Sequence, residues 1–217
     1  MSHEFTVLKT IRSPEDLRAL PRDQLPALAQ EIRDRIISVV MQNGGHLASN
    51  LGVVELTLAL HRVFDTPEDM IFWDVGHQCY THKIITGRND SFHTLRKKDG
   101  ISGFPKRNES PHDAMEAGHS STAISAGTGA LVGKRLHGNH GKVLAVIGDG
   151  ALTAGMAYEG LNNFGHSGRD AIIVLNDNGR SYAPTVSRLG ESLNRLRANP
   201  TYVRETGRLE RILRRIP

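Results

Sequence analysis

The hydrophobic positions in the second half of the chain form two short, continuous runs. Residues 143–147 (VLAVI) and 171–175 (AIIVL) are apolar throughout, which is typical of strands buried on both faces of a parallel sheet. Residues 151–164 lie between the runs and contain many small side chains, a pattern that predicts a helix. Together the three segments predict a β-α-β unit.

The first half of the chain predicts mainly helices. Ser13 suits an N-cap and Pro14 the first helical position, so a short helix is expected to begin there. Apolar residues recur at helical spacing over residues 27–41, and Gly44 is expected to end that helix. Residues 53–64 predict a further helix.

The middle of the chain changes character twice. Residues 70–73 predict the first strand of the sheet. Residues 81–116 are polar and rich in Gly and Pro, and predict a loop region flanking an active site. Residues 119–136 are largely Ser, Ala, Thr and Gly and predict a helix whose N-terminus points at the ligand crevice. The expected fold class is α/β, a parallel sheet flanked by helices and preceded by N-terminal helices.

Polar residues follow both apolar runs where the predicted strands end. Asp149 stands between Gly148 and Gly150, and Asn178 follows 29 positions later. Ligands of open α/β sheets bind at the carboxyl ends of the strands. Mg2+ prefers oxygen ligands and often bridges protein oxygens to phosphate oxygens. The glycines and the helix expected after Gly150 suit an anion, so the pattern predicts a metal-diphosphate site.

The same motif resembles the metal motif of thiamine-diphosphate enzymes, in which Gly-Asp-Gly is followed after nearly thirty residues by an asparagine. Four stretches in this order narrow the resemblance to the 1-deoxy-D-xylulose-5-phosphate synthase family. They are HLASNLGVVEL from His46, DVGHQ from Asp74, GHSS from Gly118 and NDNGRSYAPT from Asn176. The resemblance runs from about Leu8 to the last residue. A generic transketolase is the alternative interpretation.

The resemblance implies a thiamine-diphosphate-binding fold and a transferase that uses thiamine diphosphate and Mg2+. Such an enzyme condenses pyruvate with D-glyceraldehyde 3-phosphate, releases CO2, and serves isoprenoid, thiamine and pyridoxal biosynthesis. The matching positions imply three groups of site residues. These are His46 and His77 as catalytic groups; His77, Gly118, His119, Ser120, Gly150, Ala151 and Asn178 at the cofactor; and Asp149, Asn178 and the backbone carbonyl of Arg180 at the metal. Many relatives carry Glu-Met where this chain has Gly179-Arg180, a change that a carbonyl ligand survives.

The predicted organisation has three regions. Residues 1–45 form an N-terminal helical region, residues 46–190 a diphosphate- and Mg2+-binding α/β domain, and residues 191–217 an arginine-rich helical tail. In that tail, Arg204 and Arg208 begin a series of arginines that alternates with Leu and Ile at helical spacing. A solvated basic face explains this tail better than contact with DNA.

The length of 217 residues suits one large domain, whereas the family resembled has three. The pyrimidine-binding domain, which carries the cofactor-activating glutamate, and the C-terminal domain are expected to be absent, so the isolated chain should be nearly inactive. A homodimer or a companion chain carrying those domains is the expected partner. The alternatives are a subunit of a split transketolase-like enzyme and a non-catalytic remnant.

Composition is that of an ordinary α/β protein. The formal net charge is only +4 and its basic residues are spread out, so nucleic-acid binding is not expected. The N-terminus lacks a secretory pattern and no apolar run is long enough for a membrane helix, so a cytoplasmic location is predicted. The single Cys79 fits a reducing compartment, and a zinc site involving it is a minor alternative.

Other motifs and the remaining histidines offer weaker signals. The stretch from Gly129 to Arg135 has the wrong glycine spacing for a P-loop, and the stretch from Gly148 lacks the third glycine of a dinucleotide fingerprint. His82 is undecided between a functional and a structural role. Six other histidines are expected to be solvated: His61, His93, His112, His137, His140 and His166.

Overall fold

The computed structural model describes residues 5–177 and positions 192, 195, 198–201, 204–206 and 208. The first helices are α1 (Pro14–Ala19), α2 (Leu25–Asn43), α3 (Leu47–Leu51), α4 (Val54–Val63) and α5 (Tyr80–Lys83). The later helices are α6 (Ala123–Leu136), α7 (Asp149–Leu152) and α8 (Gly155–Ser167). The strands are β1 (Met70–Trp73), β2 (Val143–Gly148) and β3 (Ile172–Asn176). Single helical turns are η1 (Leu8–Thr10), η2 (Arg22–Gln24), η3 (Ile84–Arg88) and η4 (Phe92–Thr94).

The three strands form one parallel sheet in the order β1-β2-β3. Phe72 is in register with Ala145, and Gly148 with Asn176. This confirms the predicted β-α-β unit and the α/β class. Because the strands are parallel, all three carboxyl ends reach the same edge of the sheet.

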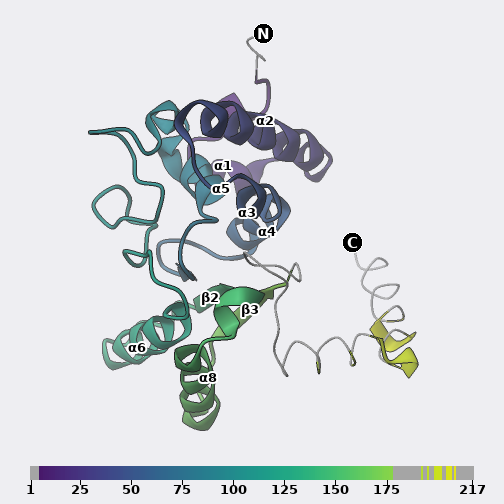
Figure 1. The fold of residues 1–217 in the computed structure, drawn as a ribbon, viewed down its shortest axis with the longest axis vertical. Helices are drawn as coiled ribbons and strands as arrows, with labels where there is room; N and C mark the ends of the chain where they lie inside the picture. Colours follow the sequence, from purple (N-terminus) through teal and green to yellow (C-terminus); the bar gives the residue numbers. More distant parts are fainter. Residues whose placement is uncertain are drawn as a thin grey trace.

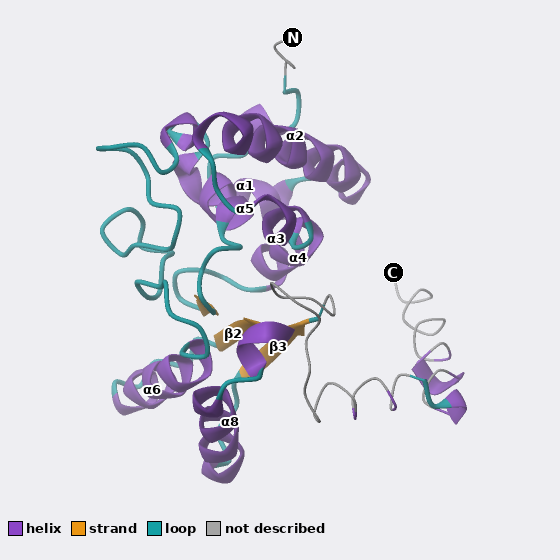
Figure 2. Cartoon of the chain, viewed as in Figure 1, coloured by secondary structure: helices purple, strands orange, loops and turns teal. Residues whose placement is uncertain are grey.

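Helices cover both faces of this sheet (Figures 1 and 2). On one face, Ile71, Trp73 and Val146 pack in a core with α1, α2, α4 and α5. On the other face, Phe72 and Ala145 pack with α6 and α8. Alternate strand residues therefore enter opposite cores, which explains why the strand sequences are apolar throughout.

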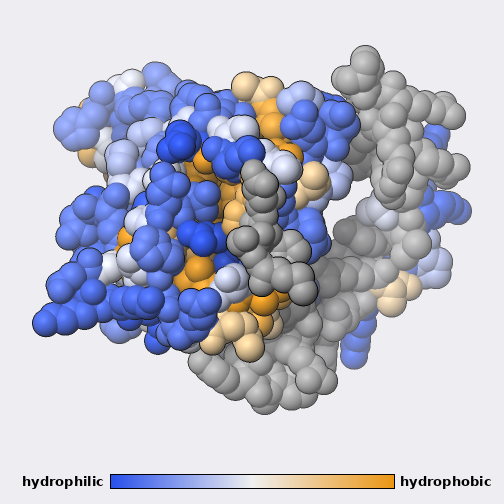
Figure 3. Space-filling view, turned by 90° about the horizontal axis from the view of Figure 1, so that it is seen from above, coloured by the Kyte–Doolittle hydropathy of each residue, from blue (hydrophilic) through white to orange (hydrophobic). Residues whose placement is uncertain are grey.

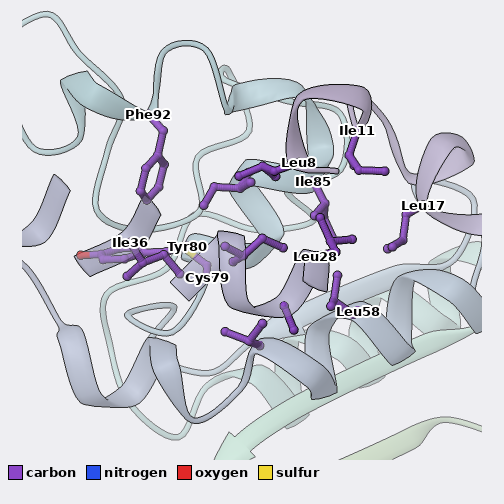
Figure 4. Packing of buried hydrophobic residues seen from close by; sticks show 14 of the residues in the cluster. Leu8, Ile11, Leu17, Leu28, Ile36, Leu58, Cys79, Tyr80, Ile85 and Phe92 are labelled. Carbon is purple, nitrogen blue, oxygen red and sulfur yellow. The ribbon is translucent and has the colours of Figure 1, made fainter. Parts of the chain in front are cut away.

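The larger core is built by the N-terminal helices (Figure 4). Leu28, Ile32 and Ile36 of α2 are fully buried at the spacing that the sequence predicted. The Ser13 hydroxyl accepts the N–H of Asp16 at 3.4 Å and the Asp16 carboxylate accepts the Ser13 N–H at 3.0 Å, a capping box that starts α1. The first helices therefore begin and end close to the predicted residues.

Three predicted elements differ from the structure. The single helix over residues 151–164 is wrong, because the Thr153 hydroxyl donates to the Gly150 carbonyl at 2.7 Å and Ala154 is extended, which separates α7 from α8. The helix over residues 119–136 begins only at Ala123, since Ser121 has a left-handed backbone with φ of 69°. The loop over residues 81–116 contains α5, η3 and η4 before it becomes irregular.

The C-terminal predictions are testable only in part. Arg195, Arg204 and Arg208 are helical and exposed, as an amphipathic tail helix requires, and the other arginines of the tail lie outside the described residues. Asn178 and Arg180 also lie outside them. Among the described residues, no helix is long and apolar enough to cross a membrane.

Hydrophilic side chains dominate one face of the molecule and leave an apolar stretch near its middle (Figure 3).

Candidate functional site

The carboxyl edge of the sheet brings together residues from all three strands. The backbone runs from β1 into Asp74, from β2 into Asp149 and from β3 into Asp177. Because Gly148 and Asn176 are in register, Asp149 and Asp177 follow neighbouring strand ends, and Asp149 begins α7. This is the edge at which open α/β sheets bind ligands, and it is where the sequence predicted the metal.

Asp74 connects β1 to the start of α6. Its carboxylate accepts the N–H of Ser121 at 2.7 Å and the N–H of Ala123 at 3.0 Å, and only 1% of Asp74 is exposed. Burial raises the pKa of Asp74, while the amide hydrogen bonds lower it. The expectation that the first amides of this helix face a ligand is therefore corrected for Ser121 and Ala123, because Asp74 already binds them.

Ser121 then joins this loop to the stretch that follows β2. Its hydroxyl donates to the Ala151 carbonyl at 2.5 Å, across 30 residues of sequence. Gly118, His119 and Ser120 precede it on an exposed loop, and Gly150 and Ala151 are half-buried. Five of the predicted cofactor residues therefore lie on this loop and on α7, which the Ser121 hydroxyl joins.

His46 and His77 lie side by side. Their ring centroids are 5.2 Å apart in an edge-on arrangement. Asn50 holds the two backbones, because its side-chain amide donates to the carbonyls of His46, at 2.5 Å, and His77, at 2.8 Å. Its Oδ1 accepts the Tyr80 N–H at 2.9 Å, which uses the remaining polar atom of this buried side chain. His46 and His77, which are far apart in the sequence, thus form one catalytic candidate.

The two imidazoles retain polar atoms that suit a ligand. The Nδ1 atoms of His46 and His77 are buried and have no hydrogen-bond partner among the described residues. Burial lowers the pKa of both, with a further contribution from Arg96 at His46 and from His46 at His77. Both rings are therefore neutral near pH 7, with one donor and one acceptor nitrogen each.

The turn after β1 has a left-handed backbone at two consecutive residues. Val75 has a φ of 58°, which is unusual for a β-branched residue, and Gly76 has a φ of 82°. A Cβ on Gly76 would lie 2.4 Å from Pro105 Cδ and 2.8 Å from the Cβ of Ala117. Such backbone strain concentrates at functional sites, and here the strained turn connects β1 to His77.

The zinc alternative at Cys79 finds no support. Among the residues that the structure describes, no three His, Cys, Asp or Glu side chains are grouped to hold a metal ion. Cys79 is fully buried, and burial raises the pKa of its thiol to about 12. A thiol that stays protonated is a poor metal ligand.

The remaining histidines divide into two groups. The prediction of solvated side chains is confirmed for four exposed residues: His93, His137, His140 and His166. It is wrong for His61, which is fully buried, and for the half-buried His112. His61 Nε2 lies 2.9 Å from His82 Nδ1, and the Thr66 hydroxyl lies 2.9 Å from His112 Nδ1. His82, undecided from sequence, is also fully buried.

A protein-family model described as 1-deoxy-D-xylulose-5-phosphate synthase matches residues 8–217. The chain belongs to the 1-deoxy-D-xylulose-5-phosphate synthase family. It is 55% identical over 214 residues to the synthase of Treponema pallidum (strain Nichols), an alignment that covers 99% of this chain and 34% of the relative. It is 56% identical over 211 residues to the synthase of Desulfitobacterium hafniense (strain Y51), covering 97% and 33%.

A third synthase, 1-deoxy-D-xylulose-5-phosphate synthase 1 of Geobacter sulfurreducens, is 54% identical over 213 residues and is covered to 33% of its length. The chain thus spans about a third of the length of the curated synthases it matches. The family resemblance drawn from the four motifs is confirmed.

Sequence reasoning missed three residues that shape the synthase-family site. Asn50 joins the backbones of the two histidines, and Asp74 caps α6. Phe104 packs against the His46 ring at a centroid distance of 6.0 Å. Asn50 and Asp74 stand inside two of the quoted motifs. Their place within those motifs was the signal that could have identified them.

Proposed function

We propose that this chain is the diphosphate- and metal-binding part of a 1-deoxy-D-xylulose-5-phosphate synthase. The complete enzyme condenses pyruvate with D-glyceraldehyde 3-phosphate and releases CO2. The observation that carries the proposal is the link from Asp74 through Ser121 to Ala151, which brings the loop at Gly118 beside the short helix α7 that begins at Asp149. Two of the four family motifs meet there, and a third begins where β3 ends.

The residues present fit the cofactor and its metal. Asp149, with Asn178 and the Arg180 carbonyl, would supply hard oxygen ligands for Mg2+. Seven residues would contact thiamine diphosphate: His77, Gly118, His119, Ser120, Gly150, Ala151 and Asn178. The buried Nδ1 atoms of His46 and His77 support this assignment, because buried polar atoms normally have partners. When bound, the cofactor supplies the carbon nucleophile that joins the two substrates.

The chain's own contribution is binding, orientation and proton transfer. His46 and His77 are neutral near pH 7 because burial lowers their pKa values. A neutral Nδ1 that carries no proton can accept one from a substrate hydroxyl, and a protonated Nδ1 can donate to a substrate carbonyl oxygen. Asn50 holds the two backbones together and the rings lie 5.2 Å apart, so both can act on one substrate.

The wider assignments belong to the same proposal. A homodimer, or a companion chain with the remaining two thirds of the relatives' length, would complete the enzyme. Neither nucleic acid nor a membrane is a proposed partner, and the proposed location is the cytoplasm. The synthase would serve isoprenoid and thiamine biosynthesis.

Reconstitution tests the activity. The chain is combined with a companion covering the remainder of a relative, and CO2 release from pyruvate is measured with and without D-glyceraldehyde 3-phosphate. We expect release that depends on both substrates and falls roughly 100-fold or more in His77→Asn. The matched control is His93→Asn. Because His93 is exposed, this variant should leave the rate unchanged. Turnover of a ketose phosphate in place of pyruvate would indicate a split transketolase, and no turnover would favour a non-catalytic remnant.

A further inference from the structure

Four charged side chains and one histidine meet in the interior, next to α5. We define the buried ion cluster as Lys83, Arg88, Glu109, Asp113 and His82. Arg88 donates two hydrogen bonds to Asp113, at 2.7 and 2.8 Å, and Lys83 donates to Glu109 at 2.5 Å. His82 Nε2 lies 2.9 Å from Asp113 Oδ1. The side chains of Lys83, His82 and Asp113 have no exposed area.

The charges and protons of this cluster are balanced. Two cations face two carboxylates. Burial alone would raise the pKa of Asp113, but hydrogen bonds from His82 and Arg88 outweigh it and hold that pKa well below its ordinary value. An ionised Asp113 requires a proton on His82 Nε2, which leaves Nδ1 to accept the Nε2–H of His61. The hydrogen bonds of Arg88 and His82, and through His82 that of His61, therefore depend on Asp113 being a carboxylate.

The cluster also binds the backbone of an irregular loop. The Ser102 N–H donates to Glu109 Oε1 at 2.7 Å, and the Lys106 N–H donates to Asp113 Oδ2 at 2.7 Å. Between η4 and α6 the described chain has no helix or strand to hold it. The two carboxylates therefore replace the hydrogen bonds that regular structure would give this loop.

The same loop packs against the catalytic candidates. Phe104 lies between the two anchored amides, and its ring contacts the ring of His46 edge-on. Its neighbour Pro105 packs on Gly76, directly before His77. A shift of residues 102–106 would therefore move Phe104, against which the His46 ring packs, and Pro105, which packs on the residue before His77.

We propose that the buried ion cluster positions His46 and His77 by fixing residues 102–106, and that Arg88 and Asp113 are positioning residues. The importance of this role for catalysis rests on the proposed function, whereas the positioning itself does not. Buried ion pairs suit such a task, because removing one partner leaves an uncompensated charge and disrupts the local structure far more than at the surface.

The test compares Asp113→Asn with Asp90→Asn in the full chain. Asn is nearly isosteric but removes the charge that Arg88 and His82 need. Asp90 pairs with Arg12 on the surface, where both side chains are more than 70% exposed, so its variant is the matched control. Hydrogen exchange of the Ser102 and Lys106 amides and NMR titration of the His46 imidazole are measured.

In Asp113→Asn we expect both amides to exchange roughly tenfold faster or more, while the Ala145 amide in β2 is unchanged. The pKa of His46 should rise toward its ordinary value, because burial holds it down. Phe104→Ala should raise that pKa without accelerating Lys106 exchange. If Asp113→Asn does not fold, the milder Glu109→Gln should show the same two changes, centred on Ser102.

Native exchange at Ser102 and Lys106 in a folded Asp113→Asn variant would overturn the proposal. So would faster exchange with an unchanged His46 titration, which would make the cluster merely structural. Neither readout needs turnover. A failure of the proposed synthase activity would leave these results intact, so the two ideas fail separately.

Discussion

Acid should destabilise this fold through His82 before any exposed carboxylate matters. His82 is fully buried, and burial lowers its pKa from 6.5 to about 4 despite the hydrogen bond to Asp113. Below pH 6.5 the unfolded chain therefore binds a proton at this position that the folded chain does not. Stability contributed by His82 is complete above pH 6.5 and is lost as the pH falls toward 4.

The magnitude follows from the shift. One pH unit below 6.5 costs about 1.4 kcal/mol for one proton, so lowering the pH to 5 removes about 2 kcal/mol. Burial also lowers the pKa values of His61 and His112, so their contributions have the same sign. A loss of this size is a large part of the roughly 5–15 kcal/mol that stabilises a typical domain.

Urea unfolding of the full chain at a series of pH values measures this effect. In His82→Gln, whose amide can still donate to Asp113, the pH dependence between 6.5 and 5 should decrease by about one proton. The exposed His93→Gln is the matched control and should keep the wild-type slope. An identical slope in wild type and His82→Gln would refute the reasoning, because His82 would then have an unshifted pKa in the fold.

Three further changes test the site by urea unfolding at pH 7. Asp74→Asn leaves one of two buried amides without a charged acceptor and should cost about 2–3 kcal/mol; a loss below about 1 kcal/mol would mean that water replaces the carboxylate. Gly76→Ala adds a methyl against Pro105 at a positive φ and should cost about 2–4 kcal/mol, whereas Gly129→Ala, with open space around it, should not destabilise. Asn50→Ala removes three hydrogen bonds and should cost about 2–4 kcal/mol and broaden the His77 resonances, and sharp native resonances would contradict its role.

Local signals in the sequence were sufficient for most of the fold. Some signals act only through neighbouring residues, so the elements that they specify were predictable. They are the apolar runs at β2 and β3, the cap at Ser13 and the glycine at position 44. The break between α7 and α8 was not, because it lies at the extended backbone of Ala154, a residue that ordinarily favours helix, beside a Thr153 hydroxyl that bonds back to Gly150.

The candidate site was also predictable from the sequence only in part. His46, His77 and Asp149 were predicted from motifs, and the structure brings the first two together. The buried ion cluster was not found, because its members are charged residues in a polar segment, a pattern that ordinarily marks solvent exposure. Their burial results from long-range pairing between residues 82–88 and 109–113, which periodicity cannot reveal.

Calorimetric titration of the full chain with thiamine diphosphate, with Mg2+ and then with excess EDTA, tests the central claim most directly. The account predicts binding that requires Mg2+ and is lost in Asp149→Ala, while Asp170→Ala, an exposed acidic residue before β3, binds as wild type does. Binding that is unchanged in Asp149→Ala, or that does not respond to Mg2+, would contradict the metal-diphosphate site at the carboxyl edge of the sheet.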